Sequence, residues 1–508
     1  MRCRLRPLWL AAVLAPALLL TGQQAKAQKA VDTLRVTWRD AIANLDPYDN
    51  PLRTGLIIAF HVWDCLVYRD PETLLIKPEL ATAWQLVDDR TIEFTLRDGV
   101  RFQDGSKFTA DDVVYTIQTI ANDKNLAVPS NYDFIAGADK IDDLHVRIRL
   151  NRVFPAALEY IAMVLPILPH AYREKVGAAV FDRAPIGTGP YRIAASSQSS
   201  IDLERYDEQF AGSPKGKPAI RFIHVREVST SADELSDLLG GQADWIWDFD
   251  PSALPKVAET PGLQALSVET MRIAYVQLDS SGRTGADNPL TNQTVREAIM
   301  HAVDRTSMAR QLAGLGSRPL DAPCYPTQFG CNTAVAAHYA YDPALARTLL
   351  KQAGYPDGFD TELVSFVLPQ WTNAVHDYLA AVGIRAKVSQ LPTNDAVRRS
   401  GDGHNPLDMG TWGSYSINDV SAILPRFFGG SPFDYLRDPE VVALVEKGGA
   451  TTDIDERRRA YTDAIRLITQ KAAFMPLFTY VKTYGFSRQL NFRPTIDEIP
   501  RFYLSSWK

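Results

Sequence analysis

The stretch from Trp84 to Thr116 constrains the fold of this chain more than any other. Residues 91–96 alternate apolar and polar side chains, which is the period of a half-buried strand. Residues 100–102 allow a short second strand between two Asp-Gly turns, because glycine accepts the positive φ of such turns. Thr109 occupies an N-cap position with an acid three residues later, as in a capping box. The order strand, turn, strand, turn, capped helix predicts an α/β unit that many folds contain.

The same stretch resembles the signature of the extracellular solute-binding proteins of family 5, the dipeptide-, oligopeptide- and nickel-binding proteins of ABC importers. In that signature a Trp precedes the pattern LR-x-G-V-x-F-x-D-G-x-x-x-x-A-D-D-V-x-x-T. The resemblance implies an α/β, bilobal periplasmic binding protein fold (type II, cluster C) with an extra subdomain inserted in the first lobe. The matching residues are Leu96, Arg97, Gly99, Val100, Phe102, Asp104, Gly105, Ala110, Asp111, Asp112, Val113 and Thr116.

Two later stretches carry the same resemblance, VREAIMHAVDR at 295–305 and YDPALARTLLKQAGYPDGF at 341–359. The resemblance extends from Leu34 to the end of the chain, and a chain of 508 residues has room for about three domain-sized units. We therefore expect lobe I to comprise residues 28–70, 187–275 and 481–508. The inserted subdomain is expected at 71–186, and lobe II at 276–480.

Residues 1–27 have the features of a cleaved secretory signal. They combine a positive start, an apolar run from Leu8 to Leu20 and the small-x-small ending Ala25-Lys26-Ala27. An uncleaved anchor is disfavoured, because it would need about 20 uninterrupted apolar residues. No cysteine follows Leu20 where a lipoprotein signal would carry one, so we expect a free protein in a Gram-negative periplasm.

The charge of the chain excludes a basic nucleic-acid binder. The formal net charge is −6, and the four cations of the leader have no acidic counterpart, so their removal leaves −10. The composition, 46% hydrophobic and 22% charged, is that of a soluble globular protein.

Cysteine usage agrees with export. Cys324 and Cys331 bracket a loop containing Pro and Gly in which a local disulfide is geometrically easy, and we expect that bridge. The alternatives are two reduced thiols or an incomplete metal pair. Cys65 lies in an apolar context that favours a buried, inert thiol.

Two stretches are candidates for the walls of a ligand cleft. Trp245 and Trp247 lie two apart, so they share one face of a strand, and Trp247 is the candidate cleft residue. Strand 363–368, helix 371–382 and strand 384–389 predict a βαβ unit, hence a parallel sheet. Ligands bind beyond the carboxyl ends of such strands, which would put residues 369–371 at the cleft.

The stretch 407–419 is the most informative for specificity. Peptide binders of the family carry W-x-x-D-Y-x-D-P here, and the first Asp pairs with the ligand's ammonium group. This chain has Trp412 but Tyr415 at the position of that Asp, with Ser414 before it. A buried ammonium without a carboxylate costs several kcal/mol, so a free peptide N-terminus is disfavoured unless another acid replaces the missing one.

The function that the resemblance implies is capture of a small solute between two lobes and its delivery to the permease of an ABC importer in the inner membrane. The solute would be peptide-like, a modified amino acid, an opine or sugar-like, and we expect a monomer without nucleic acid, cofactor or protein-ligated metal. A sensor or chaperone-like binder without an importer is an open alternative. A secreted hydrolase is disfavoured, because no G-x-S-x-G or HExxH motif is present. The expected ligand-binding residues are Trp412, Tyr415, Ser414, Trp371, Gln370, Trp247 and Tyr275, with no catalytic residue.

Overall fold

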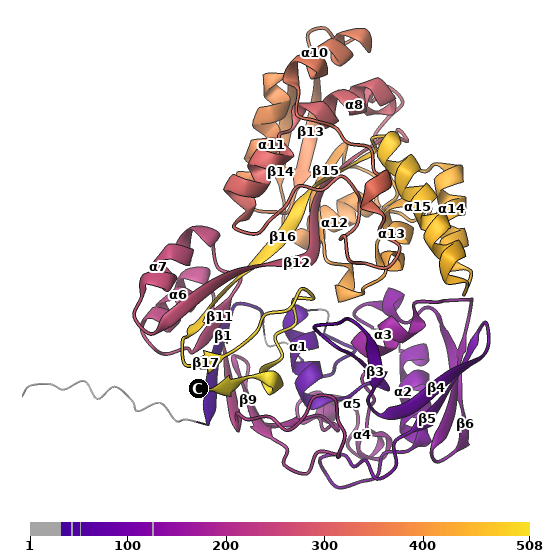
Figure 1. Ribbon diagram of the computed structural model, residues 1–508, viewed down its shortest axis with the longest axis vertical. Helices are drawn as coiled ribbons and strands as arrows, with labels where there is room; N and C mark the ends of the chain where they lie inside the picture. The colour runs from indigo at the N-terminus through magenta and orange to yellow at the C-terminus, as the bar shows by residue number, and fades with distance from the viewer. Residues whose placement is uncertain (1–31, 42–43, 51, 124–125) are drawn as a thin grey trace, which may run out of the picture.

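Two lobes connected by two long strands form the molecule, as the computed structural model shows (Figure 1). The structure describes residues 32–508 except 42–43, 51 and 124–125, so the expected signal at 1–27 lies outside the described residues. The connecting strands are β12 (Leu263–Leu278) and β16 (Phe474–Ser487), which pair antiparallel with each other. The lobe boundaries expected at 275/276 and 480/481 both fall inside these strands, and we propose that the lobes divide there.

A single ten-stranded sheet passes through both lobes in the order β14-β13-β15-β12-β16-β11-β1-β10-β9-β8. In lobe I, β1 is flanked by parallel β10 and β11, while β8, β9 and β10 pair antiparallel. Figure 1 shows α1 beside this part of the sheet. The bounds are β1 (Thr33–Trp38), α1 (Arg53–Val62), β8 (Tyr191–Ser196), β9 (Ser200–Arg205), β10 (Phe222–Glu227), α6 (Ser231–Leu239), β11 (Trp245–Trp247) and α7 (Leu254–Glu259).

A separate four-stranded sheet of order β4-β5-β7-β6 lies at the lower right of Figure 1. Strand β5 covers Thr91–Leu96, as predicted, and the capping box is confirmed, because Thr109 and Asp112 each accept a hydrogen bond from the other's backbone N–H. The expected strand at 100–102 is reduced to an isolated bridge between Arg101 and Lys107, since the turn at Gly105 follows too soon for a ladder. The bounds are β2 (Val67–Arg69), β3 (Ile76–Pro78), β4 (Ala81–Asp88), α2 (Ala110–Asn122), β6 (Ile135–Asp142), β7 (His145–Leu150), α3 (Ala157–Val164), α4 (His170–Val176) and α5 (Ala178–Phe181).

Lobe II contains the predicted βαβ unit. Strands β13 (Phe359–Ser365) and β14 (Ile384–Gln390) are parallel and are joined by α11 (Pro369–Ala381), while β15 (Leu407–Trp412) connects β13 to β12. The lobe also contains α8 (Gln293–Ala302), α9 (Arg305–Met308), α10 (Pro343–Gln352), α12 (Thr393–Gly401), α13 (Leu424–Phe428), α14 (Pro439–Gly449) and α15 (Ile454–Gln470). Two short strands after β16, β17 (Leu490–Asn491) and β18 (Ser506–Trp507), pair with each other near the end of the chain.

The motif GTGPY at 187–191 is a packing point for α1. A Cβ added at Gly187 would lie 2.1 Å from the carbonyl oxygen of Val62, and one at Gly189 would lie 2.6 Å from the carbonyl carbon. Only glycine allows this approach, and the N–H of Gly189 donates to the same oxygen at 2.9 Å. The end of α1 is thereby fixed against the sheet.

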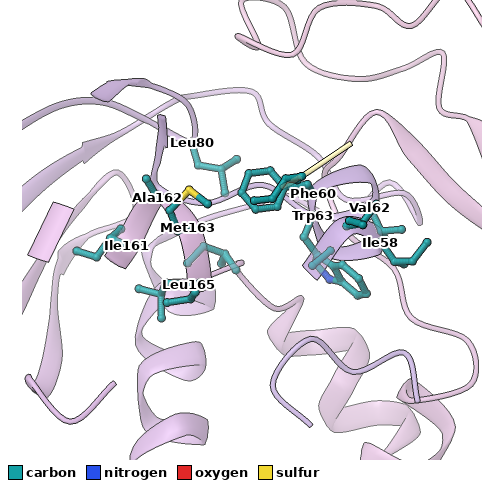
Figure 2. Close-up of a cluster of buried hydrophobic side chains, with 14 of the residues drawn as sticks. Ile58, Phe60, Val62, Trp63, Leu80, Ile161, Ala162, Met163 and Leu165 are labelled. Carbon is teal, nitrogen blue, oxygen red and sulfur yellow. The ribbon is translucent and has the colours of Figure 1, made fainter. Parts of the chain in front are cut away.

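The core of lobe I joins α1 to α3. Figure 2 shows Phe60 and Trp63 from the end of α1 in one buried cluster with Met163 from α3. These three side chains also line the main cavity, so the same packing that stabilises the lobe shapes the site. No helix in the described part of the chain has the length and hydrophobicity that a membrane span requires.

Candidate functional site

The main cavity lies between the lobes and has a volume of about 230 Å³. One water needs about 10–15 Å³ of such space, so there is room for roughly 15 to 23 water-sized groups. Lobe I supplies most of the wall, β12 supplies Arg272, and the end of β15 with the segment after it supplies the wall from lobe II. The lining residues are Pro47, Tyr48, Asn50, Leu52, Arg53, Leu56, Ala59, Phe60, Trp63, Cys65, Glu79, Ala127, Val128, Asn131, Tyr132, Met163, Val164, Pro166, Lys215, Arg272, Trp412, Gly413 and Tyr415.

Trp412 and Tyr415 form the aromatic wall from lobe II. Their rings meet edge-on with centroids 5.0 Å apart. The indole Nε1 of Trp412 donates to the carbonyl of Ala422 at 2.9 Å, and the guanidinium of Arg426 stacks over the ring at 4.3 Å. Trp412 is therefore held rigidly, as an aromatic wall of a binding cavity must be.

The segment after Trp412 has an uncommon backbone. Ser414, Tyr415 and Ser416 have φ values of 50°, 49° and 64°, in the left-handed region that costs energy for residues other than glycine. The tertiary contacts of the segment must offset that cost. The aromatic side chain of Tyr415 reaches the cavity through this conformation, while Ser414 is buried.

Ser416 joins the two lobes. Nη1 of Arg53 donates to its Oγ at 2.6 Å, and that Oγ donates to the carbonyl of Asp497 at 2.5 Å. Its own carbonyl accepts a hydrogen bond from Arg69, whose other Nη contacts Asp497 at 2.8 Å. Glu159 of α3 accepts from the N–H of Asn418 at 3.2 Å. We call residues 413–418 the latch loop, since it fastens lobe II to lobe I beside the cavity.

The disulfide loop supports the latch loop from behind. Cys324 and Cys331 form a disulfide, with Cα atoms 5.9 Å apart. Within that loop, Gln328 donates to the carbonyl of Ile417 at 2.9 Å, and the N–H of Phe329 donates to the carbonyl of Asn418 at 3.0 Å. Cys65 is a free, buried thiol on the cavity wall.

Two arginines on the cavity wall share one carboxylate. Arg272 contacts Glu498 through Nε at 3.0 Å and Nη2 at 2.9 Å, and Nη2 of Arg53 lies 3.5 Å from the same group. Burial alone would raise the pKa of Glu498, but the positive charges of Arg272, Lys482 and Arg53 hold it well below its usual range. Two guanidinium groups of the main cavity wall thus share one carboxylate.

One carboxyl group lines the cavity within the described residues, that of Glu79. Burial raises its pKa well above the ordinary value, although Lys215 opposes the shift. The ammonium group of Lys215 lies 2.7 Å from Asp64 and 3.4 Å from Glu79. Burial would lower the pKa of Lys215, but the two acids raise it, so this lysine is charged.

Trp247 lines a second cavity of about 120 Å³, which shares Arg53 and Arg272 with the main one. The ammonium of Lys482 lies over its ring at 4.9 Å from the centroid and 2.6 Å from Asp248. Trp245 is fully buried in the core beside it. As expected, the two tryptophan rings lie on the same face of β11, with centroids 5.8 Å apart.

Three other expected site residues lie away from the main cavity. Trp371 is 2% exposed and packs edge-on against Phe478 and Tyr480, with its Nε1 donating to the carbonyl of Leu312. Pro369 begins α11, so the residue two positions later turns inward onto the lobe II core. Gln370 is exposed on the same turn.

Tyr275 is the third of these residues. It stacks on Phe474 at 4.9 Å and meets Phe427 at 5.1 Å within a buried aromatic cluster. It therefore supports the wall from behind, because Phe427 also contacts Trp412. The sequence pattern placed Tyr275 on the right strand but did not reveal which face of that strand meets the cavity.

Sequence reasoning missed Arg53, Arg272, Lys215 and Glu79. Each comes from a different segment, and only the tertiary fold brings them together. A charged residue inside the apolar strand stretch MRIAYVQL is the one local signal that could have indicated Arg272. No group of three or more His, Cys, Asp or Glu side chains suited to a metal ion is present in the part of the chain that the structure describes.

Two lobes, two crossing strands and a cavity lined from both lobes define a bilobal solute-binding protein. The family model of the bacterial extracellular solute-binding proteins, family 5 (middle), matches residues 76–435, and the chain belongs to this family. The family resemblance and the α/β bilobal fold expected from the sequence are confirmed. The chain is a binding protein of the class that serves ABC importers, and the family is one of binding proteins rather than enzymes.

The chain is similar to several known proteins over most of its length. It is 27% identical over 462 residues to the glutathione-binding protein GsiB of Salmonella typhi, covering 85% of this chain and 86% of that one. The ABC transporter-associated periplasmic binding protein DppA of Helicobacter pylori, solved with the peptide STSA, has a TM-score of 0.79 at 21% identity and covers 94% and 98% of the two chains. MoaA of A. tumefaciens R10, solved with mannopinic acid, has a TM-score of 0.76 at 21% identity and covers 94% and 100%. The two solved structures show the shared fold.

Proposed function

We propose that this chain is the monomeric, periplasmic solute receptor of an ABC importer and that its ligand is a small organic acid. The solute binds in the main cavity, with its apolar part against Trp412 and Tyr415 and its carboxylate toward Arg53 and Arg272. The lobes close over it, and the permease in the inner membrane receives it. Trp247 is proposed to contact a polar extension of the ligand through the second cavity.

The main observation in favour of an acidic ligand is that two arginines share Glu498. Both guanidinium groups depend on this one carboxylate for their ion pair, and a ligand carboxylate would add a second acceptor beside them. A guanidinium has five N–H donors, so each arginine can donate a further charge-assisted hydrogen bond to a ligand carboxylate. Arg53 and Arg272 line the cavity, and their side chains are 17% and 24% exposed, so part of each side chain is accessible.

The same cavity disfavours a free amino group on the ligand. Tyr415 stands where peptide binders of the family carry an ammonium-binding acid, and its ring is part of the wall. The acid that does line the described wall, Glu79, lies beside the lysine ammonium of Lys215. An N-acylated peptide, an opine or another acid without a free ammonium group therefore fits better than a simple dipeptide.

The solutes named for two similar proteins are both organic acids. One is a glutathione-binding protein, and another was solved with mannopinic acid. Glutathione also carries a free ammonium group, so these names support the carboxylate of the proposed ligand and not the absence of an ammonium group. The cavity volume of about 230 Å³ suits a solute of the size of a small peptide or a sugar conjugate.

A thermal-shift panel tests the proposal. Each acid, from opines to N-acetyl dipeptides, is paired with its carboxamide, and dipeptides, sugars and nickel chelates complete the panel. A ligand at about 100 times its Kd adds roughly 2.7 kcal/mol of stability, so a true ligand raises the Tm by several degrees. We expect acids to shift the Tm and their amides to fail. Large shifts with simple dipeptides, or equal shifts with acid and amide, would contradict the proposal.

Replacing Arg53 tests how much its positive charge contributes to the affinity for the acid. Arg53→Met keeps an unbranched aliphatic stem, although a shorter one, and removes the charge-assisted hydrogen bonds, which contribute about 1.5–3 kcal/mol each. We expect the Kd of the best acid to rise at least tenfold by calorimetry. Arg493→Met is the matched control, because the side chain of Arg493 is 82% exposed and pairs with exposed Glu72. Equal affinity in the Arg53 variant and the control would remove Arg53 from the site.

Uptake of the labelled solute by the host, with and without this gene, tests the importer role. We expect uptake to fall when the gene is deleted and to return on complementation. Unchanged uptake would favour the sensor interpretation instead.

A further inference from the structure

A buried lysine fills a cage of oxygen atoms beside the main cavity. Lys215 is 3% exposed, and its ammonium donates to the carbonyl of Trp63 at 2.6 Å. It lies 2.7 Å from Oδ1 of Asp64 and 3.4 Å from Oε1 of Glu79. Within the described part of the chain, the ammonium makes one hydrogen bond, to Trp63, and the two carboxylate oxygens are its ion-pair partners. The cage thus surrounds one ammonium group with three oxygen atoms.

Aromatic rings complete the cage. The ammonium lies 5.7 Å from the ring centroid of Phe60 and 5.8 Å from that of Tyr503. Carboxylates combined with aromatic faces are the general means by which proteins bind organic ammonium ions. Here the bound ammonium belongs to the protein itself.

The chain delivers this lysine on a specialised turn. Gly212 and Gly216 have φ values of 82° and 65°, which glycine adopts at little cost, and the N–H of Lys215 donates to Oγ of Ser213 at 3.3 Å. The turn brings Lys215, the one buried residue of 207–217, into the lobe.

The cage belongs to the wall of the solute cavity. Both Glu79 and Lys215 line that cavity, so an ammonium group on a solute would approach Glu79 and, behind it, the other oxygen atoms of the cage. It would find the positive charge of Lys215 in front of them.

We propose that Lys215 is a specificity-determining residue, a built-in occupant of a primary-ammonium subsite that keeps the ammonium groups of solutes out of the cavity. The inference rests on the proposed function in placing solutes in this cavity. The ligand class of the emptied subsite is a primary alkylammonium ion. Binding of the alkylammonium ion to the emptied subsite does not depend on which organic acid is the solute of the receptor.

Chemical rescue tests the subsite. Lys215→Ala removes three methylene groups and the ammonium, the equivalent of n-propylammonium. We expect n-propylammonium chloride to raise the Tm of K215A in a saturable manner, by several degrees more than in wild type. The neutral probe 1-propanol should have no such effect. Equal shifts with both probes, or equal shifts in K215A and wild type, would overturn the proposal.

A second substitution identifies the acid that holds the ammonium. Asp64→Asn in the K215A background should weaken the response to propylammonium at least tenfold, because Asp64 is the nearest carboxylate. Asp360→Asn in the same background is the matched control, since Asp360 is an exposed acid of lobe II paired with Arg385. An unchanged response in D64N/K215A would show that propylammonium binds elsewhere and would overturn the assignment.

Poor folding of K215A does not remove the test. The readout then becomes the refolding yield with propylammonium against the yield with 1-propanol at equal concentration. Rescue by the ammonium alone supports the subsite, and equal yields contradict it. If no acid of the panel shifts the Tm but propylammonium rescues K215A, the proposed ligand class is wrong and the proposed subsite is supported.

Discussion

At the scale of single residues, two tryptophans expected in the same site have different environments. Trp412 lines the cavity, while Trp371 is buried in the lobe II core against Phe478. We expect Trp412→Ala, like Tyr415→Ala, to abolish binding of the best acid with a small loss of stability. Trp371→Ala should instead lower the free energy of unfolding by about 3–5 kcal/mol, the usual cost of a large core cavity.

Calorimetry and urea unfolding of both tryptophan variants check this prediction. Wild-type affinity in W412A would remove the aromatic wall from the site. A W371A variant of wild-type stability that no longer binds the ligand would show that Trp371 belongs to the site.

His61 predicts a pH dependence of stability. It is fully buried, its Nδ1–H donates to the carbonyl of Ile57 at 2.7 Å, and its Nε2 accepts from the N–H of Phe502 at 3.1 Å. Burial lowers its pKa to about 3, and the charges of Lys215 and Arg501 act in the same direction. The folded state therefore binds fewer protons than the unfolded state, whose histidine has a pKa near 6.5.

The stabilising contribution of neutral His61 is complete above pH about 6.5 and is lost as the pH falls toward 3. Between pH 6.5 and 4.5 the loss is on the order of 2–3 kcal/mol. We expect urea unfolding to show this fall in wild type and a smaller one in His61→Gln. His376→Gln, at a partly exposed position of α11, is the control. Equal falls in wild type and H61Q would show that His61 does not carry the effect.

At the scale of elements, the latch loop couples the cavity to lobe closure. Ser416→Ala removes the Oγ that accepts from Arg53 and donates to Asp497. We expect a more open average shape, seen as a larger radius of gyration by small-angle scattering without ligand, and an affinity several-fold weaker. Ser421→Ala is the matched control, because within the described residues the Oγ of Ser421 has no hydrogen-bond partner. Identical scattering of S416A and S421A would show that the loop does not hold the lobes together.

Elements set by local sequence could be predicted. The capping box of α2 and the parallel pair β13 and β14 follow from periodicity and capping residues within short windows. The family resemblance added the two lobes and their crossing strands. The strand expected at 100–102 failed because the closeness of the next turn, rather than the apolar pattern, decides whether a ladder forms.

The site could be predicted only in part. Trp412 and Tyr415 belong to one short motif that can be compared directly with the family. Trp371 was misplaced because the face that a helix turns to the core depends on what packs there, in this case Phe478. The pairing of Arg53 with Arg272 depends on segments remote in sequence, so no local pattern contains it.

At the scale of the whole molecule, the account describes a receptor that closes on a small acid without changing it. Closure places contacts from lobe I, a crossing strand and lobe II around one cavity. No single segment binds the solute alone. Affinity and closure should therefore rise and fall together across the variants above.

A crystal structure of the protein with the strongest acid of the thermal-shift panel tests this account most directly. We predict an intact solute between Trp412 and α1, with its carboxylate within hydrogen-bonding distance of Arg53 or Arg272. A solute bound outside the interlobe cavity, its carboxylate directed away from both arginines, or density for a chemically altered compound would contradict it.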